Sequence, residues 1–172
     1  RPKAIVIFSA HFESDVTTIA ATDDVHEMVY DYYGFPDEYY QVKYPARGST
    51  IVAGMVEDRL REKGIPVRRK YRGMDHGVFP ILMHAYPEAD IPVVPVSVNP
   101  YLPPRGQIAI GEALRGLEDD GVMVIGSGFV THNLRIFEME KDAPPHAWTV
   151  RFRDWIREKV TARDIDALVQ YE

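Results

Sequence analysis

The 172-residue chain contains no cysteine. Disulfide frameworks, thiolate metal sites and cysteine nucleophiles are therefore excluded, and any metal ion would have to be bound by histidine and carboxylate side chains. The chain also lacks an excess of positive charge, since 20 Lys and Arg residues stand against 26 Asp and Glu residues, for a net charge of −6. A polyanionic partner would meet overall repulsion, so we expect no binding to nucleic acid.

Long apolar runs are missing too. No stretch approaches the ~18–20 residues of a transmembrane helix, and the first residues show no leader pattern, so we expect a cytoplasmic protein that does not bind membranes. Hydrophobic residues make up 45% of the chain and charged residues 27%, which is ordinary globular usage and enough for one compact core. Because the chain opens on an apolar run without a Met, we expect it to be an incomplete part of a longer chain.

Short apolar runs predict the strands of one sheet. The three strongest are rich in Ile and Val, as is typical of strands covered on both faces of a parallel sheet, and they are Lys3–Ser9, Ile91–Val98 and Val122–Ser127. Two weaker candidates, Val16–Ala21 and Val67–Tyr71, carry more polar residues. We therefore expect a mixed, largely parallel sheet.

Helical patterns alternate with these runs. The predicted helices are Ser49–Lys63, with Ser49 as N-cap and Gly64 as the stop, and then Val78–Ala85, Gln107–Leu117 and Trp148–Val160. Two further segments, Asp23–Gly48 and Phe137–His146, fit neither class and are expected to be ordered loops. The alternation predicts a single α/β domain over residues 1–172, with helices on both faces of the sheet.

Three histidines fall at the ends of predicted strands or in a short loop. His11 follows the first strand, His132 follows the last, and His76 lies in the loop segment Met74–Gly77. Because parallel strands end at the same edge of a sheet, where ligands are usually bound, we expect the three side chains to converge on one site. For any one of them alone, a hydrogen-bonded loop residue is the simpler interpretation.

The other histidines favour structural roles. His26 has acidic neighbours and is expected at the surface, His84 is expected to be a helix-end or core residue, and His146 is expected in a surface loop. Ser9 and Ser127 lack the Gly-x-Ser-x-Gly turn of a serine nucleophile, so we expect them to cap strand ends.

Six spaced segments carry a family resemblance. They are Ser9–Phe12 (SAHF), Tyr30–Pro36 (YDYYGFP), Tyr44–Ser49 (YPARGS), Met74–Gly77 (MDHG), Tyr86–Val93 (YPEADIPV) and Gly126–Arg135 (GSGFVTHNLR). In this order they resemble the class III extradiol ring-cleavage dioxygenases, and within them the DOPA-dioxygenase type of the LigB-like superfamily.

The resemblance implies an oxidoreductase of aromatic compound metabolism that binds non-haem Fe(II) or Zn(II) and cleaves a catechol-type ring with O2. His11 matches a metal ligand of that family. His132 matches a histidine that serves either as a further ligand or as the catalytic base, and His76 matches an acid/base histidine near the small aromatic diol substrate. The resemblance leaves the roles of Tyr30 and Asp31 open. Some relatives carry His where Tyr30 stands, and His26 is a candidate to compensate for it.

The resemblance also implies ligands that the chain does not contain. The family places another metal histidine in a His-Gly-x-Pro loop upstream of the first strand and a final ligand beyond residue 172. Two alternatives to the dioxygenase therefore stay open. A zinc-dependent hydrolase could use the same histidines to activate water, and a non-catalytic metal-binding relative could act as an interaction protein.

Overall fold

The computed structural model describes residues 1–136, 138, 140 and 142–171. Contacts within the chain form two compact units, the larger made of Arg1–Leu102 with Gly106–Gly128 and the smaller of Pro103–Arg105 with Phe129–Glu172. The loop expected over Phe137–His146 falls partly outside the described residues. The assignment of residues 1–172 as one domain of a longer dioxygenase chain stays a prediction.

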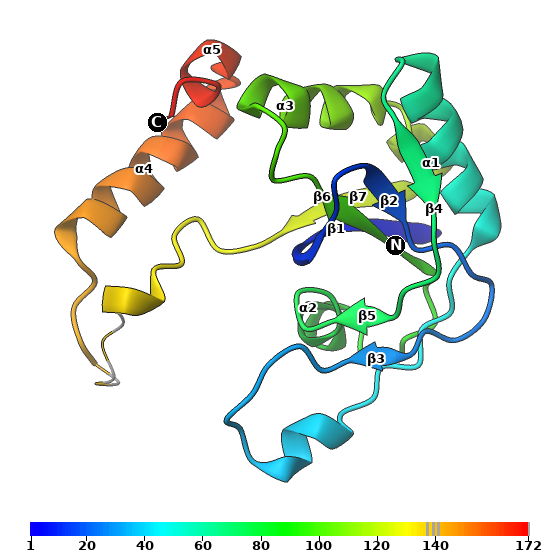
Figure 1. Cartoon of the computed structure of the whole chain (residues 1–172), viewed down its shortest axis with the longest axis horizontal. Helices are drawn as coiled ribbons and strands as arrows, with labels where there is room; N and C mark the ends of the chain where they lie inside the picture. The colour runs from blue at the N-terminus through cyan, green and yellow to red at the C-terminus, as the bar shows by residue number, and fades with distance from the viewer. Residues whose placement is uncertain (137, 139, 141, 172) are drawn as a thin grey trace. The chain divides into compact units, whose positions relative to one another are not determined.

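A five-stranded sheet forms the centre of the larger unit (Figure 1). Its strand order is β4 (Val67–Arg69), β2 (Thr17–Ile19), β6 (Val93–Val98), β1 (Ala4–Glu13) and β7 (Val122–Ser127). Strand β1 runs parallel to both β6 and β7, and β2 runs parallel to β4 but antiparallel to β6. The predicted α/β class with a mixed, largely parallel sheet is confirmed.

Alternating side chains of β1 supply two hydrophobic cores, one on each face of the sheet. Ala4 and Val6 belong to one cluster, whereas Ile5 and Ile7 belong to the other, and all four are at most 2% exposed. Successive residues of a strand point to opposite faces, so a continuous apolar run needs a cover on both sides. This pattern explains why helices lie on both faces.

The covering helices are α1 (Thr50–Glu62) and α3 (Pro104–Ala113) on one face and α2 (Phe79–Ala85) on the other (Figure 1). Helix α1 begins as predicted, because the Ser49 hydroxyl accepts a hydrogen bond from the Val52 amide at 3.2 Å. Helix α3 begins three residues earlier and ends four residues earlier than expected. The chain turns at Gly116, whose φ of +88° is left-handed, before the 3₁₀ turn η2 (Glu118–Asp120).

The segment Asp23–Gly48, which was expected to be a loop, contains regular structure that was not predicted from its sequence. It contains β3 (Met28–Val29) and the 3₁₀ helix η1 (Asp37–Gln41). Strand β3 pairs in parallel with β5 (Met74–Asp75), and together they form a separate two-stranded sheet. The expectation of a loop was wrong at these two elements. For β3 the reason is that a two-residue strand has too few positions to show an alternating pattern.

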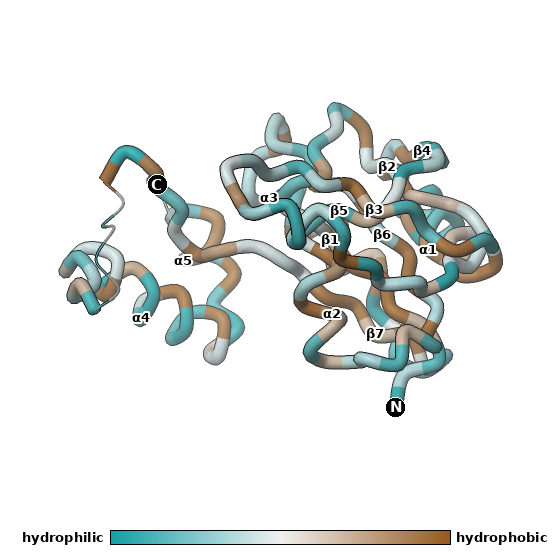
Figure 2. Tube along the Cα trace, turned by 90° about the horizontal axis from the view of Figure 1, so that it is seen from below, coloured by the Kyte–Doolittle hydropathy of each residue, from teal (hydrophilic) through white to brown (hydrophobic). Residues whose placement is uncertain are grey.

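The smaller unit is helical. Its elements are η3 (Leu134–Ile136), α4 (Ala147–Ala162) and α5 (Ile165–Leu168), so the predicted helix at Trp148–Val160 is confirmed. Polar and apolar residues alternate along α4 (Figure 2), and the Phe152 and Trp155 rings stack with their centroids 5.9 Å apart. None of the described residues from 129 to 171 is buried. Within the described parts of the chain, no helix is both long and apolar enough to cross a membrane.

Candidate functional site

The short β3–β5 ladder brings two polar side chains together. Val29 pairs with Asp75, His76 directly follows the end of β5, and Asp31 lies two positions beyond the end of β3. His76 Nδ1 lies 2.6 Å from Asp31 Oδ1, and the His76 backbone amide donates to the same oxygen at 3.2 Å. The carboxylate therefore orients both the backbone and the ring of His76.

His11 reaches the same place from the central sheet. It was expected after the first strand but lies within β1, which runs to Glu13 past a shift of register between Ser9 and Glu13. Its Nδ1 is 3.2 Å from Asp31 Oδ2, and its ring centroid is 3.9 Å from that of His76. The predicted convergence of His11 and His76 is thus observed, and both rings share one carboxylate.

Partial burial and the neighbouring imidazole act in opposite directions on Asp31. Burial raises the pKa of this carboxyl group, but hydrogen bonds from the His76 ring and amide outweigh burial and hold the pKa below its ordinary value. The side chain is 22% exposed. Asp31 therefore remains an anion at neutral pH and can accept hydrogen bonds from imidazole N–H groups.

The donor set of this cluster fits a metal ion. His11, Asp31 and His76 each offer one ligand atom, and these atoms lie within 4.8 Å of one another. Two imidazole nitrogens and a carboxylate oxygen are a combination that binds first-row transition metals in proteins. From the sequence, the role of Asp31 was left open, because the only signal was its place in the segment Tyr30–Pro36, which was interpreted as part of a loop.

An aromatic pocket of about 300 Å³ adjoins the cluster at His76. Its wall is mostly apolar and is formed by Tyr32, Phe35, Tyr39, Val42, His76, Phe79, Pro80, Met83 and His84. The Tyr32 ring stands edge-on to the His76 ring at 5.4 Å, while its hydroxyl donates to the Tyr39 carbonyl at 2.6 Å. A small planar ligand placed here would lie against His76.

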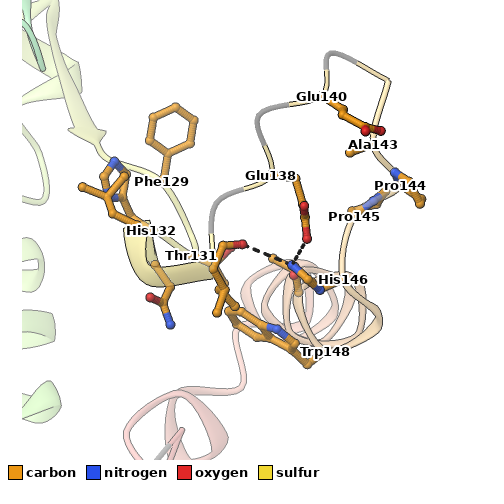
Figure 3. A pocket seen from close by; sticks show the side chains of 14 residues that line it. Phe129, Thr131, His132, Glu138, Glu140, Ala143, Pro144, Pro145, His146 and Trp148 are labelled. Carbon is orange, nitrogen blue, oxygen red and sulfur yellow. Dashed lines mark hydrogen bonds and ion pairs between the residues drawn. The ribbon is translucent and has the colours of Figure 1, made fainter. Parts of the chain in front are cut away.

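His132 belongs to the smaller unit. It lines a pocket of about 360 Å³ with Phe129, Trp148 and His146 (Figure 3), and its ring centroid is 5.8 Å from that of Phe129. Within this pocket His146 Nε2 lies 3.2 Å from the Ile136 carbonyl and 3.5 Å from Glu138 Oε1. The roles predicted for His132, as metal ligand or catalytic base, stay predictions.

The remaining histidines divide between the interior and the surface. His26 was expected at the surface but is only 3% exposed, with Nε2 2.8 Å from the Val93 carbonyl, and burial lowers its pKa. The acidic neighbours suggested a surface position, but the His26 ring lies in the interior, where the Val93 carbonyl is its hydrogen-bond partner. His84 occupies the last turn of α2 and His146 precedes α4, and both are exposed, as expected for a helix-end residue and a surface loop.

Known proteins resemble this chain over most of its length. It is 37% identical to a 4,5-DOPA dioxygenase extradiol of Beta vulgaris, covering 100% of this chain and 64% of the relative. It is 34% identical to the 4,5-DOPA dioxygenase extradiol of Escherichia coli K12, covering 94% and 59%. The chain thus spans about three-fifths of the length of these curated relatives.

A solved structure and a family model also match this chain. The crystal structure of an uncharacterized protein from Escherichia coli K12 superimposes with a TM-score of 0.78 at 33% identity, covering 94% of this chain and 60% of that one. Residues 1–172 match the family model described as the catalytic LigB subunit of aromatic ring-opening dioxygenase. The family model over the whole chain and the identity to these relatives show that the chain belongs to the LigB family of extradiol dioxygenases.

Proposed function

We propose that the protein is a metal-dependent extradiol dioxygenase that cleaves a catechol-type aromatic ring with O2. The observation that carries the proposal is the cluster of His11, Asp31 and His76 beside an aromatic pocket that shares His76. Family membership supports the reaction class. We also propose that the enzyme works in the cytoplasm and takes a small aromatic diol as its substrate.

Separate tasks are proposed for the residues of the cluster. His11 would bind Fe(II) or Zn(II), with His132 as a second ligand or as the base. A bound metal ion would supply Lewis-acid binding of the two diol oxygens and a site for O2. His76 would exchange a proton with the diol. The Asp31 contact to Nδ1 leaves Nε2 free for that exchange, the arrangement by which a carboxylate fixes the tautomer of a catalytic imidazole.

The pocket would select the shape of the ring. Aromatic edges and faces of Tyr32, Phe35 and Phe79 surround a space suited to one planar ring, and edge-to-face contacts favour aromatic ligands over aliphatic ones of equal size. At His76 the wall becomes polar, so the diol edge of the ring would turn towards the histidine cluster. This placement would leave the rest of the substrate at the open mouth.

Oxygen consumption tests the proposal. The full-length enzyme, loaded in turn with Fe(II) and with Zn(II), is supplied with a catechol while dissolved O2 and ring-opened product are recorded. We expect O2 uptake in step with product. Turnover with zinc in the absence of O2 would instead assign a hydrolase, and metal binding without any turnover would assign a non-catalytic relative.

Two variants test the division of tasks. His11→Ala should lose both metal and turnover, whereas His76→Ala should keep the metal and lose turnover by about 10²–10⁴-fold, the usual effect of removing a general acid or base. Metal content by atomic absorption and O2 uptake are measured on the same preparations. Loss of metal from His76→Ala in proportion to activity would make His76 a ligand.

A further inference from the structure

A fully buried carboxylate lies directly behind the cluster. Asp75 is 0% exposed and receives three hydrogen bonds. Its Oδ1 accepts from the Ser9 hydroxyl at 2.6 Å and from the Gly77 amide at 2.9 Å, and its Oδ2 accepts from Arg72 Nη1 at 2.5 Å. Such a group is costly to bury, and these charged and neutral donors offset the cost.

Two of these donor side chains, Ser9 and Arg72, also form hydrogen bonds with the backbone of His11. The Ser9 hydroxyl oxygen accepts from the His11 amide at 3.2 Å, and Arg72 Nη2 donates to the His11 carbonyl at 3.2 Å. Both backbone polar groups of His11 are therefore linked to Asp75 through one intermediate side chain each. The Arg72 guanidinium also lies over the Phe12 ring at 4.5 Å, which holds it in place.

The third donor fixes the turn that carries His76. Asp75 and Gly77 flank His76, and the Oδ1 contact to the Gly77 amide closes the backbone around it. Gly77 fits tightly, because a Cβ atom there would meet the Ser9 hydroxyl oxygen at 2.4 Å. On its other side, the Gly77 carbonyl accepts from the Ser127 hydroxyl of β7 at 2.5 Å.

We propose that Asp75 and Arg72 form a positioning pair that sets the separation of the His11 and His76 imidazoles. One carboxylate ties the strand carrying His11 to the turn carrying His76, although the two histidines are 65 positions apart in the chain. Neither residue of the pair touches the substrate in this assignment. The catalytic consequence rests on the proposed function, whereas the geometric consequence does not.

The test compares four forms of the full chain: the unaltered protein, Asp75→Asn, Arg72→Lys and Glu57→Gln. Asparagine keeps the size of Asp75 but has one acceptor oxygen, so it cannot serve both Arg72 and the Ser9–Gly77 side. Lysine keeps the charge of Arg72 but lacks the fork that reaches Asp75 and His11 together. Glu57 of α1 is the matched control, a carboxylate 8% exposed that pairs with Arg61 of the same helix and with Arg69 of β4.

Nuclear Overhauser effects between labelled histidine rings, recorded without metal, read the separation directly. We expect a strong His11–His76 cross-peak in the unaltered protein and in Glu57→Gln, and its loss in Asp75→Asn and Arg72→Lys. Spectral dispersion and thermal unfolding identify any variant that fails to fold. If Asp75→Asn does not fold, Arg72→Lys decides the question alone. An unaltered cross-peak in the folded variants, or its absence from the unaltered protein, would overturn the proposal.

Steady-state kinetics supply the second measurement. Asp75→Asn should lower kcat by about 10–100-fold, the usual effect of altering an outer-shell partner, while KM changes less than about threefold. Glu57→Gln should leave both unchanged. Equal losses in the two variants would reduce Asp75 to a stabilising residue and refute the pair. If the cross-peaks follow the expected pattern but no form turns over a catechol, the positioning pair stands and the proposed function fails.

Discussion

The two histidine-bearing regions of the molecule are built in opposite ways. His11 and His76 stand on strands and turns tied to a buried carboxylate, within a unit whose sheet has hydrophobic cores on both faces. His132 stands in a segment where none of the described residues from 129 to 171 is buried, and its ring contact is the nearby Phe129. The position of the first two is therefore determined by the interior, and that of His132 by local contacts.

This difference has a consequence for the chemistry. Catalytic groups must be held close to their productive geometry, and packing together with hydrogen bonds from supporting residues supplies that rigidity. The cluster of His11, Asp31 and His76 has such support. We therefore expect changes behind the cluster to alter activity through geometry, and changes around His132 to act mainly through His132 itself.

The largest expected effect concerns His132. In the full-length enzyme, His132→Ala should lower catechol turnover by about 10²–10⁴-fold, because a base beside the bound diol is lost. Iron content should stay near that of the unaltered enzyme. Iron analysis and O2 uptake on one preparation check both statements. Near-normal turnover would remove His132 from the mechanism, and a parallel loss of iron would make it a ligand.

The next largest effect is a difference in stability between side-chain truncations in the two units. Leu82 of α2 is 0% exposed, so Leu82→Ala should lower the free energy of unfolding by about 2–5 kcal/mol through lost burial and a residual cavity. Val160 of α4 is 57% exposed, and Val160→Ala should change the free energy of unfolding by less than about 0.5 kcal/mol. Urea unfolding measures both. Equal losses would show that α4 contributes to a core of comparable importance.

A pair of glycines gives a smaller contrast. Gly77→Ala places a methyl group 2.4 Å from the Ser9 hydroxyl oxygen and should destabilise the fold by about 1–3 kcal/mol. Gly111 in α3 has no atom within 4 Å of its added Cβ, so Gly111→Ala should stabilise the helix by about 0.5–1 kcal/mol. Thermal unfolding distinguishes the signs. A neutral result for Gly77→Ala would mean that the turn can move away from β1.

The smallest effect is a pH dependence that originates at His26. Burial lowers the pKa of His26 below its ordinary value of 6.5, so the unfolded chain binds a proton more readily than the folded one. Its stability contribution is complete above pH 6.5 and is lost as the pH falls below that value towards the folded pKa. His26→Gln should flatten this part of the profile, measured by urea unfolding between about pH 7 and 5. An unchanged slope would exclude His26 as its source.

Much of the fold could be predicted because its signals are local. The run Lys3–Ser9 predicts a strand buried on both faces. The Ser49 cap and the spacing of the apolar residues predict α1. Such patterns follow from the geometry of a single element and need no knowledge of its neighbours. The C-terminal end of α3 lies earlier than predicted, because the chain turns at Gly116 while the apolar pattern continues through this position.

The site was predictable only in part. His11 and His76 were identified from their positions and from the family motifs, and the structure brings their rings together. The role of Asp31 was left open, because Asp31 is placed by a two-residue strand whose pairing with β5 joins segments about 45 positions apart. His26 was predicted at the surface because its neighbours in sequence are acidic. In the structure its ring is buried, and the carbonyl of Val93, distant in sequence, accepts a hydrogen bond from it.

The amino-acid sequence by itself therefore determined the α/β class, the main helices and strands, and the family. These depend on apolar periodicity and on motifs that are read along the chain. Only the tertiary structure decided that Asp31 joins His11 and His76, and that the buried Asp75 lies behind them. Hydrogen bonds between residues far apart in sequence carry no local pattern, because their partners meet only when the strands β1, β3 and β5 have formed their sheets.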